Sequence, residues 1–221
     1  MSGDREQPTE GARSEHRRVA QAERFPAEAA VPETKRHLEL RTLLYQLLKL
    51  AFADRAAIGC DQFVYWDPTD ARACLAPDAF VRLGEADSLF RSWKVWERGA
   101  PQVAVEVISE ADERDSDWEA KLDKYRHLGV TELVRFDPES SERPLRIWDA
   151  SEDHELIERE LAAPRAQSRC LPGFWLAIEQ LETGPTLRLS HDEHGAELYL
   201  TPAESANERI RELEAELRNR P

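Results

Sequence analysis

Three ionisable residues stand on segments whose other residues indicate burial: Asp78, Glu106 and Lys121. Two carboxylates and a lysine are sufficient for the metal-assisted hydrolysis of a phosphodiester bond. Mg²⁺ takes oxygen ligands and keeps several waters, so both carboxylates and the main-chain carbonyl of Val107 would make an open cation site, with Mg²⁺ favoured over Mn²⁺. The cation would polarise the phosphate and help to form hydroxide. Lys121 would orient or activate the attacking water and offset charge in the transition state.

The same residues also have a structural interpretation. Glu106 and Lys121 could form a buried ion pair that only holds a helix on a sheet, and their spacing alone favours neither interpretation. A pair of carboxylates could instead act on a glycoside, but that reaction gives Lys121 no role.

The segment around Glu106 predicts a central strand. Val103–Ser109 is a short, almost continuous run of apolar and β-branched residues, which is typical of a strand buried on both faces. An ionised carboxylate in such a strand needs a cation, a metal or dense hydrogen bonding to offset the loss of water. The position of Glu106 is therefore a hint of function.

A helix is expected after this strand. Ser116 begins a capping-box pattern, Gly129 is a typical helix stop, and a strand is predicted over 132–137. Lys121 lies about 40° from the centre of the inward-facing stripe, whereas Lys124 lies about 100° away and should face solvent. The crossover from strand to helix to strand should therefore bring Lys121 to the buried carboxylate. The stripe consists of Trp118, Leu122, Tyr125 and Leu128.

Asp78 belongs to a predicted hairpin. Two strand-like runs, Ile58–Trp66 and Ala71–Leu83, flank a turn at 67–70. Pro77 falls near the middle of the second run, where a regular central strand disfavours proline. We therefore expect a bend or an edge at Pro77 that re-aims Asp78.

An amphipathic helix precedes the hairpin. His37 lies one turn before this helix pattern and on its apolar face, so it is either a histidine packed at the rim of the core or an additional site residue. The apolar residues that define the pattern are Leu40, Leu43, Leu44, Leu47, Leu48 and Ala51.

Composition limits the function classes. The net charge of −14 over 221 residues argues against non-specific coating of nucleic acid but does not exclude a nuclease with a local basic groove. The three cysteines form no C-x-x-C pair, and no apolar run approaches the roughly 20 residues that cross a bilayer. We expect a soluble cytoplasmic protein without a membrane partner.

Three motifs carry a resemblance to a known family. PDAFV at Pro77–Val81, VAVEVIS at Val103–Ser109 and KLDKYRHLGVTELVRFDP at Lys121–Pro138 occur in this order. Together they resemble the Uma family of putative restriction endonucleases, a branch of the PD-(D/E)XK nuclease superfamily. The likeness runs from about His37 to Trp175.

The resemblance implies an α/β fold: a restriction-endonuclease-like core in which helices flank a mixed central β-sheet. It implies that Asp78 is the first acid of the motif, Glu106 the second and Lys121 the lysine. The usual lysine of the superfamily lies two residues after the second acid, where this chain has Ile108. In the Uma branch the lysine comes from the following helix, in agreement with the inward face predicted for Lys121.

We therefore expect a metal-dependent endonuclease that acts on phosphodiester bonds, in DNA rather than RNA. The alternative is a catalytically silent restriction-endonuclease-like module for binding or assembly. The expected organisation is a mobile tail over 1–33, a nuclease-like domain over 34–182, a β-hairpin extension over 183–201 and an amphipathic helix over 202–221. The heptad-like spacing of that helix fits docking on the domain, a homodimer, or a solvated and frayed helix.

Overall fold

A mixed six-stranded sheet forms the centre of the fold. The computed structural model describes residues 34–109, 115–180 and 184–219, so the expected N-terminal tail lies outside these ranges. Strands β6 and β7 are parallel, and every other neighbouring pair in this sheet is antiparallel, which confirms the predicted mixed sheet and parallel crossover. In spatial order the strands are β1 (Ala56–Gly59), β4 (Ala79–Leu83), β6 (Val103–Val107), β7 (Glu132–Phe136), β8 (Leu145–Ala150) and β9 (Leu156–Glu158).

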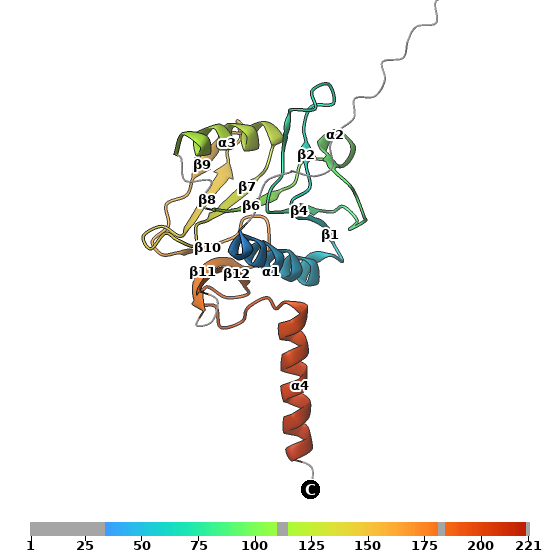
Figure 1. Cartoon of the computed structure of the whole chain (residues 1–221), viewed down its shortest axis with the longest axis vertical. Helices are drawn as coiled ribbons and strands as arrows, with labels where there is room; N and C mark the ends of the chain where they lie inside the picture. The colour runs from blue at the N-terminus through green and yellow to red at the C-terminus, as the bar shows by residue number, and fades with distance from the viewer. Residues whose placement is uncertain (1–33, 110–114, 181–183, 220–221) are drawn as a thin grey trace, which may run out of the picture.

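Helices cover both faces of this sheet (Figure 1). One face packs against α1 (Lys35–Phe52) and a three-stranded sheet of longer strands. The other face packs against α3 (Asp115–Leu128) and a three-stranded sheet of two-residue strands, the smaller sheet. The sheet of longer strands contains β10 (Arg165–Gln167), β11 (Phe174–Gln180) and β12 (Gly184–Ser190). The smaller sheet contains β3 (Cys74–Leu75), β2 (Val64–Tyr65) and β5 (Trp93–Lys94), and the short helix α2 (Val95–Arg98) follows it. None of the helices within the described ranges is long and apolar enough to span a membrane.

Alternation along β6 decides where Glu106 points. The apolar core on the α1 side of the sheet includes Val103, Val105 and Val107. The apolar core on the α3 side includes Ala104 and Ile108. Successive side chains of a strand point to opposite faces, so Glu106 faces α3. All five residues of β6 are buried, as expected for a central strand.

The predicted hairpin is present but is divided between two sheets. Its outer part pairs β1 with β4, and its inner part pairs β2 with β3. Asp61 has a φ of 65°, and Pro77 occupies the gap between β3 and β4. These two residues interrupt the two arms of the hairpin, so the expected bend at Pro77 is confirmed and Asp78 precedes β4.

The start of helix α3 differs from the expected one. Helix α3 begins at Asp115, so Ser116 lies inside the helix and does not precede it. Gly129 follows the last helical residue with a φ of 84°, which confirms the predicted stop.

The expected terminal hairpin, with arms at 187–189 and 197–200, is present as a short antiparallel contact: the amide of Tyr199 donates to the Leu189 carbonyl and that of His191 donates to the Glu197 carbonyl, around a bridge between Ser190 and Leu198. Along its full length, however, β12 pairs with β11 on its other edge, which was not expected.

The partner of β12 follows from burial. Leu187 and Leu189 lie in the same apolar cluster as Trp175 of β11, and pairing with β11 buries this face. The first strand of the expected extension therefore belongs to the main core.

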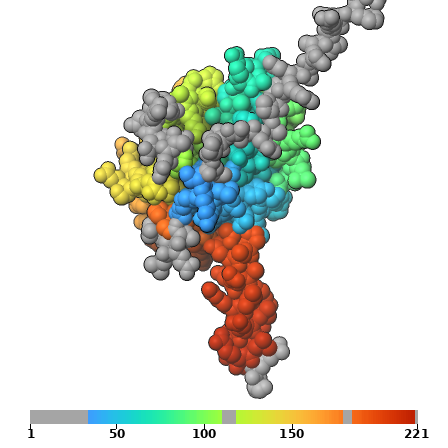
Figure 2. All heavy atoms as spheres, in the orientation of Figure 1, coloured from blue at the N-terminus to red at the C-terminus, as the bar shows by residue number. Residues whose placement is uncertain are grey.

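Helix α4 (Pro202–Arg218) projects from the body of the protein and stands clear of it (Figures 1 and 2). Thr201 and Glu204 form a capping box at its start, and Glu204 also accepts two hydrogen bonds from the buried Arg188. No residue of α4 is buried, and Ile210 and Leu213 are exposed. Docking of its apolar face on the domain is therefore wrong, while pairing with a second copy stays a prediction.

Candidate active site

The two predicted acids lie next to each other on neighbouring strands. Ala79 of β4 is the partner of Val105 in β6, and continuing this antiparallel register by one residue sets Asp78 opposite Glu106. Asp78 is 6% exposed and Glu106 is 3% exposed. Two carboxylates that are taken out of water at directly opposed positions of neighbouring strands need compensating positive charge or hydrogen bonds.

Glu106 receives this compensation from α3. Lys121 Nζ lies 2.8 Å from Glu106 Oε2, and the hydroxyl of Tyr125 donates a hydrogen bond to Oε1. The convergence of Lys121 and Glu106 predicted from the helical stripe is confirmed, and Lys124 is exposed as expected. The hydrogen bond from Tyr125 was missed, because the sequence pattern showed only an inward-facing aromatic residue.

Burial dominates the protonation of this carboxyl group. It raises the pKa of Glu106 to about 7, and the negative charge of Asp78 acts in the same direction, whereas Lys121 and Tyr125 act to lower it. Burial and the charge of Glu106 also raise the pKa of Tyr125 well above its ordinary value. Tyr125 therefore stays a neutral phenol that can donate its hydrogen, and Glu106 holds its proton to higher pH than an exposed glutamate does.

Asp78 is held by the end of β6 and by the first turn of α1. Its Oδ2 accepts a hydrogen bond of 2.8 Å from the amide of Val107. Its Oδ1 lies 3.1 Å from Nε2 of His37, and the same nitrogen lies 3.0 Å from the carbonyl oxygen of Val107. The structure thus brings His37 to Asp78 and to the carbonyl group of Val107 that was expected to bind the cation.

We call Asp78, Glu106, Lys121, Tyr125 and His37 the acidic cluster. Its oxygen donors fit a hard divalent cation. The carboxylates of Asp78 and Glu106 and the Val107 carbonyl supply oxygen atoms only, as Mg²⁺ prefers. Both oxygens of each carboxylate also contact a protein donor. Within the described ranges, no group of three or more His, Cys, Asp or Glu residues is arranged to hold a metal ion.

Two residues of the acidic cluster, Lys121 and His37, are partly exposed at the surface. The side chain of Lys121, which contacts Glu106, is 26% exposed. His37 lines a surface hollow of about 140 Å³ together with Thr34, Arg36, Leu40, Ile108, Ser109, Pro138 and Glu139.

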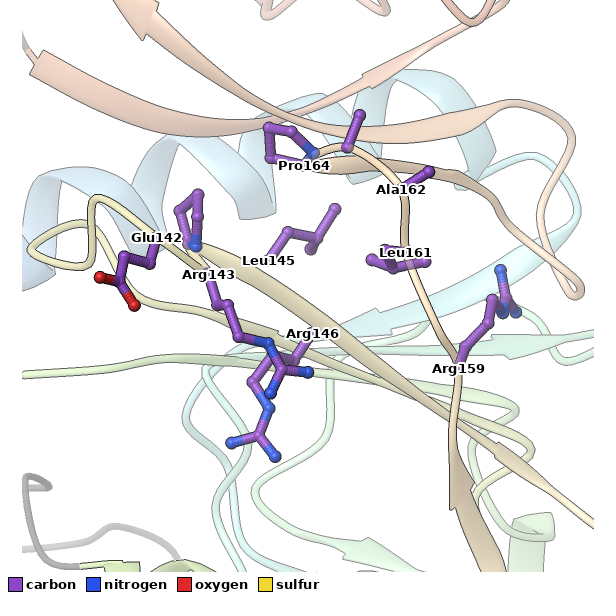
Figure 3. A pocket seen from close by; sticks show the side chains of 10 residues that line it. Glu142, Arg143, Leu145, Arg146, Arg159, Leu161, Ala162 and Pro164 are labelled. Atoms are coloured by element: carbon purple, nitrogen blue, oxygen red, sulfur yellow. The ribbon is translucent and has the colours of Figure 1, made fainter.

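A second hollow lies elsewhere and is lined by arginines (Figure 3). No residue of the acidic cluster lines this second hollow. Arg143 and Arg146 are ion-paired with Glu158, and Arg159 is ion-paired with Asp149. Each of these arginines has an acidic partner, and Asp78, Glu106 and Lys121 lie elsewhere, so the hollow is not the candidate active site.

This chain is similar to known proteins in two comparisons. A crystal structure from Anabaena variabilis, described as a putative nuclease belonging to DUF820, matches at 14% identity and a TM-score of 0.44, over 62% of this chain and 73% of that chain. A search of curated proteins gives no match. Residues 26–179 match the family Uma2, described as "Putative restriction endonuclease", and this range includes His37, Asp78, Glu106 and Lys121. The chain therefore belongs to the Uma2 family of putative restriction endonucleases.

Proposed function

We propose that this protein is a divalent-metal-dependent endonuclease that hydrolyses phosphodiester bonds in DNA. The observation that supports this most directly is the contact of 2.8 Å between Lys121 and Glu106, with Asp78 beside Glu106 on the neighbouring strand. This is the combination of two acids and a lysine that the chemistry requires, and the lysine comes from the crossover helix. Membership in a family described as "Putative restriction endonuclease" supports DNA as the substrate.

Asp78, Glu106 and the Val107 carbonyl would hold the cation. A divalent cation held by these residues would supply Lewis-acid chemistry: it would polarise the phosphate and lower the pKa of a water. Asp78 is oriented for this role by the amide of Val107, which fixes one carboxylate oxygen. Tyr125 fixes one oxygen of Glu106 in the same way.

Lys121 serves both the acid and the substrate in this proposal. Its ammonium group favours the ionised form of Glu106, which is the form that binds a cation. Its partial exposure lets the same group approach the phosphate or the attacking water, where a positive charge offsets the charge that develops in the transition state.

The proposal is tested by incubating the full chain with supercoiled plasmid, single-stranded DNA and RNA in Mg²⁺, in Mn²⁺ and in EDTA. We expect cleavage of DNA that EDTA abolishes and that Asp78→Asn and Glu106→Gln each reduce by at least about a thousandfold. Glu119→Gln removes an exposed acid from α3 and is the matched control, with activity unchanged. Full activity in the double variant of Asp78 and Glu106 would exclude this site.

A catalytically silent module for binding or assembly is the second candidate. It is favoured by one observation: in the cluster, both oxygens of Asp78 and of Glu106 already contact groups of the protein. In that case neither Mg²⁺ nor Mn²⁺ would bind, and DNA would stay intact in every condition of the same experiment.

A further inference from the structure

The two arms of the hairpin that carries Asp78 slip by one residue at Asp61. The pairs of β1 with β4 and of β2 with β3 share one register, and this register would set Asp61 opposite Asp78. The amide of Asp61 instead donates a hydrogen bond of 2.9 Å to the carbonyl oxygen of Pro77. The arm that carries Asp78 therefore has one extra residue at this point, as in a β-bulge, and bulges re-aim side chains. The flanking pairs are Gly59 with Phe80 and Val64 with Leu75.

The backbone of Asp61 makes the slip possible. Its φ of 65° lies in the left-handed region, which costs energy for most residues and is tolerated best by glycine, asparagine and aspartate. Within the described ranges, His154 is the other residue besides glycine with a positive φ. A residue keeps such a conformation only where its surroundings enforce it.

Helix α1 supplies part of this enforcement. The guanidinium group of Arg41 is ion-paired with the carboxylate of Asp61, and the side chain of Arg41 is only 12% exposed. His37 lies one helical turn earlier and contacts Asp78. The same face of α1 thus contacts both arms of the hairpin where they slip.

The hydrogen bond from Asp61 fixes the peptide unit that precedes Asp78. Proline has no N–H, so the carbonyl group is the one main-chain group through which Pro77 can be anchored by a hydrogen bond. Asp61 binds this carbonyl, which belongs to the peptide unit that joins Pro77 to Asp78. The carboxylate of Asp78 then accepts a hydrogen bond of 2.8 Å from the amide of Val107.

We propose that Asp61 is a positioning residue for Asp78: its left-handed backbone creates the slip, holds the peptide unit before Asp78 and so aims the Asp78 carboxylate at the Val107 amide. Asp61 acts through its main chain and does not touch the substrate. The effect on catalysis rests on the proposed function, whereas the contact between Asp78 and Val107 is present in the metal-free protein. A misplacement of about 1 Å at a reacting group can slow a reaction by about a hundredfold.

The test compares Asp61→Ala with Asp61→Gly in the full chain. Both variants lack the carboxylate that pairs with Arg41, and they differ because glycine adopts a positive φ without strain. His154→Ala and His154→Gly are the matched controls. His154 is exposed, has a φ of 62° and lies in the turn between β8 and β9, so it carries the same backbone requirement at another place.

The first measurement is made without metal. Nuclear magnetic resonance gives the proton shift and the hydrogen-exchange rate of the Val107 amide, which report its bond to Asp78. In Asp61→Ala we expect a changed shift and exchange at least about tenfold faster, because a hydrogen bond to a charged acceptor is weakened. Asp61→Gly should keep the wild-type values, and so should both variants of His154.

The second measurement is the single-turnover rate of plasmid cleavage in Mg²⁺ and in Mn²⁺. We expect the rate to fall at least about tenfold in Asp61→Ala and to return to the wild-type value in Asp61→Gly. The two variants of His154 should cleave at the wild-type rate. A purely structural role of Asp61 would instead lower stability in Asp61→Ala, as at His154, without changing the rate of the folded protein.

The two measurements separate this inference from the nuclease proposal. A disturbed Val107 amide in Asp61→Ala, together with intact DNA in every condition for the wild type, would support the positioning and overturn the nuclease proposal. If the wild type cleaves DNA, an unchanged rate in Asp61→Ala would overturn the positioning role and leave the nuclease proposal intact. An unchanged Val107 amide, or an equal change in Asp61→Ala and Asp61→Gly, would also overturn it, because the cause would not be the backbone of Asp61.

Hydrogen exchange in the wild type decides if Asp61→Ala does not fold. When the bond from Asp61 to Pro77 holds Asp78 in place, the amides of Asp61 and Val107 open together and their exchange rates have the same urea dependence. An Asp61 amide that exchanges at the rate of an exposed amide while the Val107 amide stays protected would overturn the inference.

Discussion

Tyr125 donates a hydrogen bond to Glu106 Oε1, one helical turn beyond the lysine that contacts the other oxygen of the same carboxylate. Residues four apart lie on the same face of a helix, so α3 presents a lysine and a phenol together to one strand. Each donor binds a different oxygen, which fixes the carboxylate plane. The pair thus orients the acid that the proposed cation would use.

Replacing Tyr125 by Phe tests this orientation. The ring still fills its place in the core, but Glu106 loses one donor, so we expect the free energy of unfolding to fall by about 1–3 kcal/mol at pH 8, where the carboxylate is ionised. The loss should be smaller at pH 5, where a protonated carboxyl needs fewer donors. Urea denaturation at both pH values measures it, and an equal loss at the two values would contradict a role specific to the ionised acid.

Lys121 and Lys124 make a matched pair for separating catalysis from charge. Lys121→Met should abolish cleavage while leaving cation binding measurable at pH 8, because the cation ligands remain. Lys124→Met removes the same charge from an exposed position of the same helix and should leave the rate unchanged. Cleavage rates and calorimetric Kd values for both variants check this, and a slow Lys124→Met variant would instead indicate a general effect of charge on DNA binding.

The raised pKa of Glu106 makes the stability of the metal-free protein depend on pH. The folded pKa is about 7 and the ordinary value is 4.5, so the folded state binds more protons than the unfolded state between these values. Its contribution to stability is complete below pH 4.5 and is lost as pH rises through about 7. Relative to Glu106→Gln, which cannot ionise, the wild type should lose on the order of 3 kcal/mol over this window.

Thermal or urea unfolding in EDTA from pH 4.5 to pH 8 measures this difference between the two proteins. Addition of Mn²⁺ at pH 8 should restore stability to the wild type and not to the Gln variant, because a ligand that binds only the folded state stabilises it. A constant difference between the two proteins across the pH range would show that Glu106 ionises in both states alike.

Helix α4 gives a prediction about assembly. Its exposed Ile210, Leu213 and Leu217 follow heptad spacing, and a parallel pairing of two copies would set Arg209 of one copy against Glu214 of the other. We therefore expect a mass above that of the monomer in concentrated samples by sedimentation equilibrium. Leu213→Glu should return the protein to a monomer, and a monomeric wild type at all concentrations would contradict the pairing.

The sequence was sufficient for features that depend on local periodicity. The run of apolar residues around Glu106 predicted a buried strand, and the helical stripe predicted the side of α3 that carries Lys121. The partner of β12 could not be predicted, because it depends on which distant face Leu187 and Leu189 cover. The contact of His37 with Asp78 likewise joins residues 41 positions apart in sequence (78 − 37), which no local pattern encodes.

The sequence could not distinguish a buried acid of the candidate site from a buried acid with a structural role. Glu132, at the start of β7, is fully buried like Glu106, but no pattern marked it. It accepts hydrogen bonds from Ser168 Oγ, the amide of Arg169 and Trp175 Nε1, and it pairs with Arg159. Burial of a carboxylate is therefore not by itself a sign of function in this fold.

Glu132→Ala separates the two kinds of buried acid. The substitution leaves the partly buried Arg159 with one fewer partner and leaves the donors of Ser168 and Trp175 unsatisfied, so we expect a loss of about 3–5 kcal/mol in the free energy of unfolding. Cation affinity should not change at temperatures where the variant is folded, because none of these groups contacts Asp78 or Glu106. Urea denaturation and Mn²⁺ titration of the same samples test both parts. A stable variant would show that the network around Glu132 contributes little, and a variant with altered Kd would show that the two buried acids are coupled through β6 and β7.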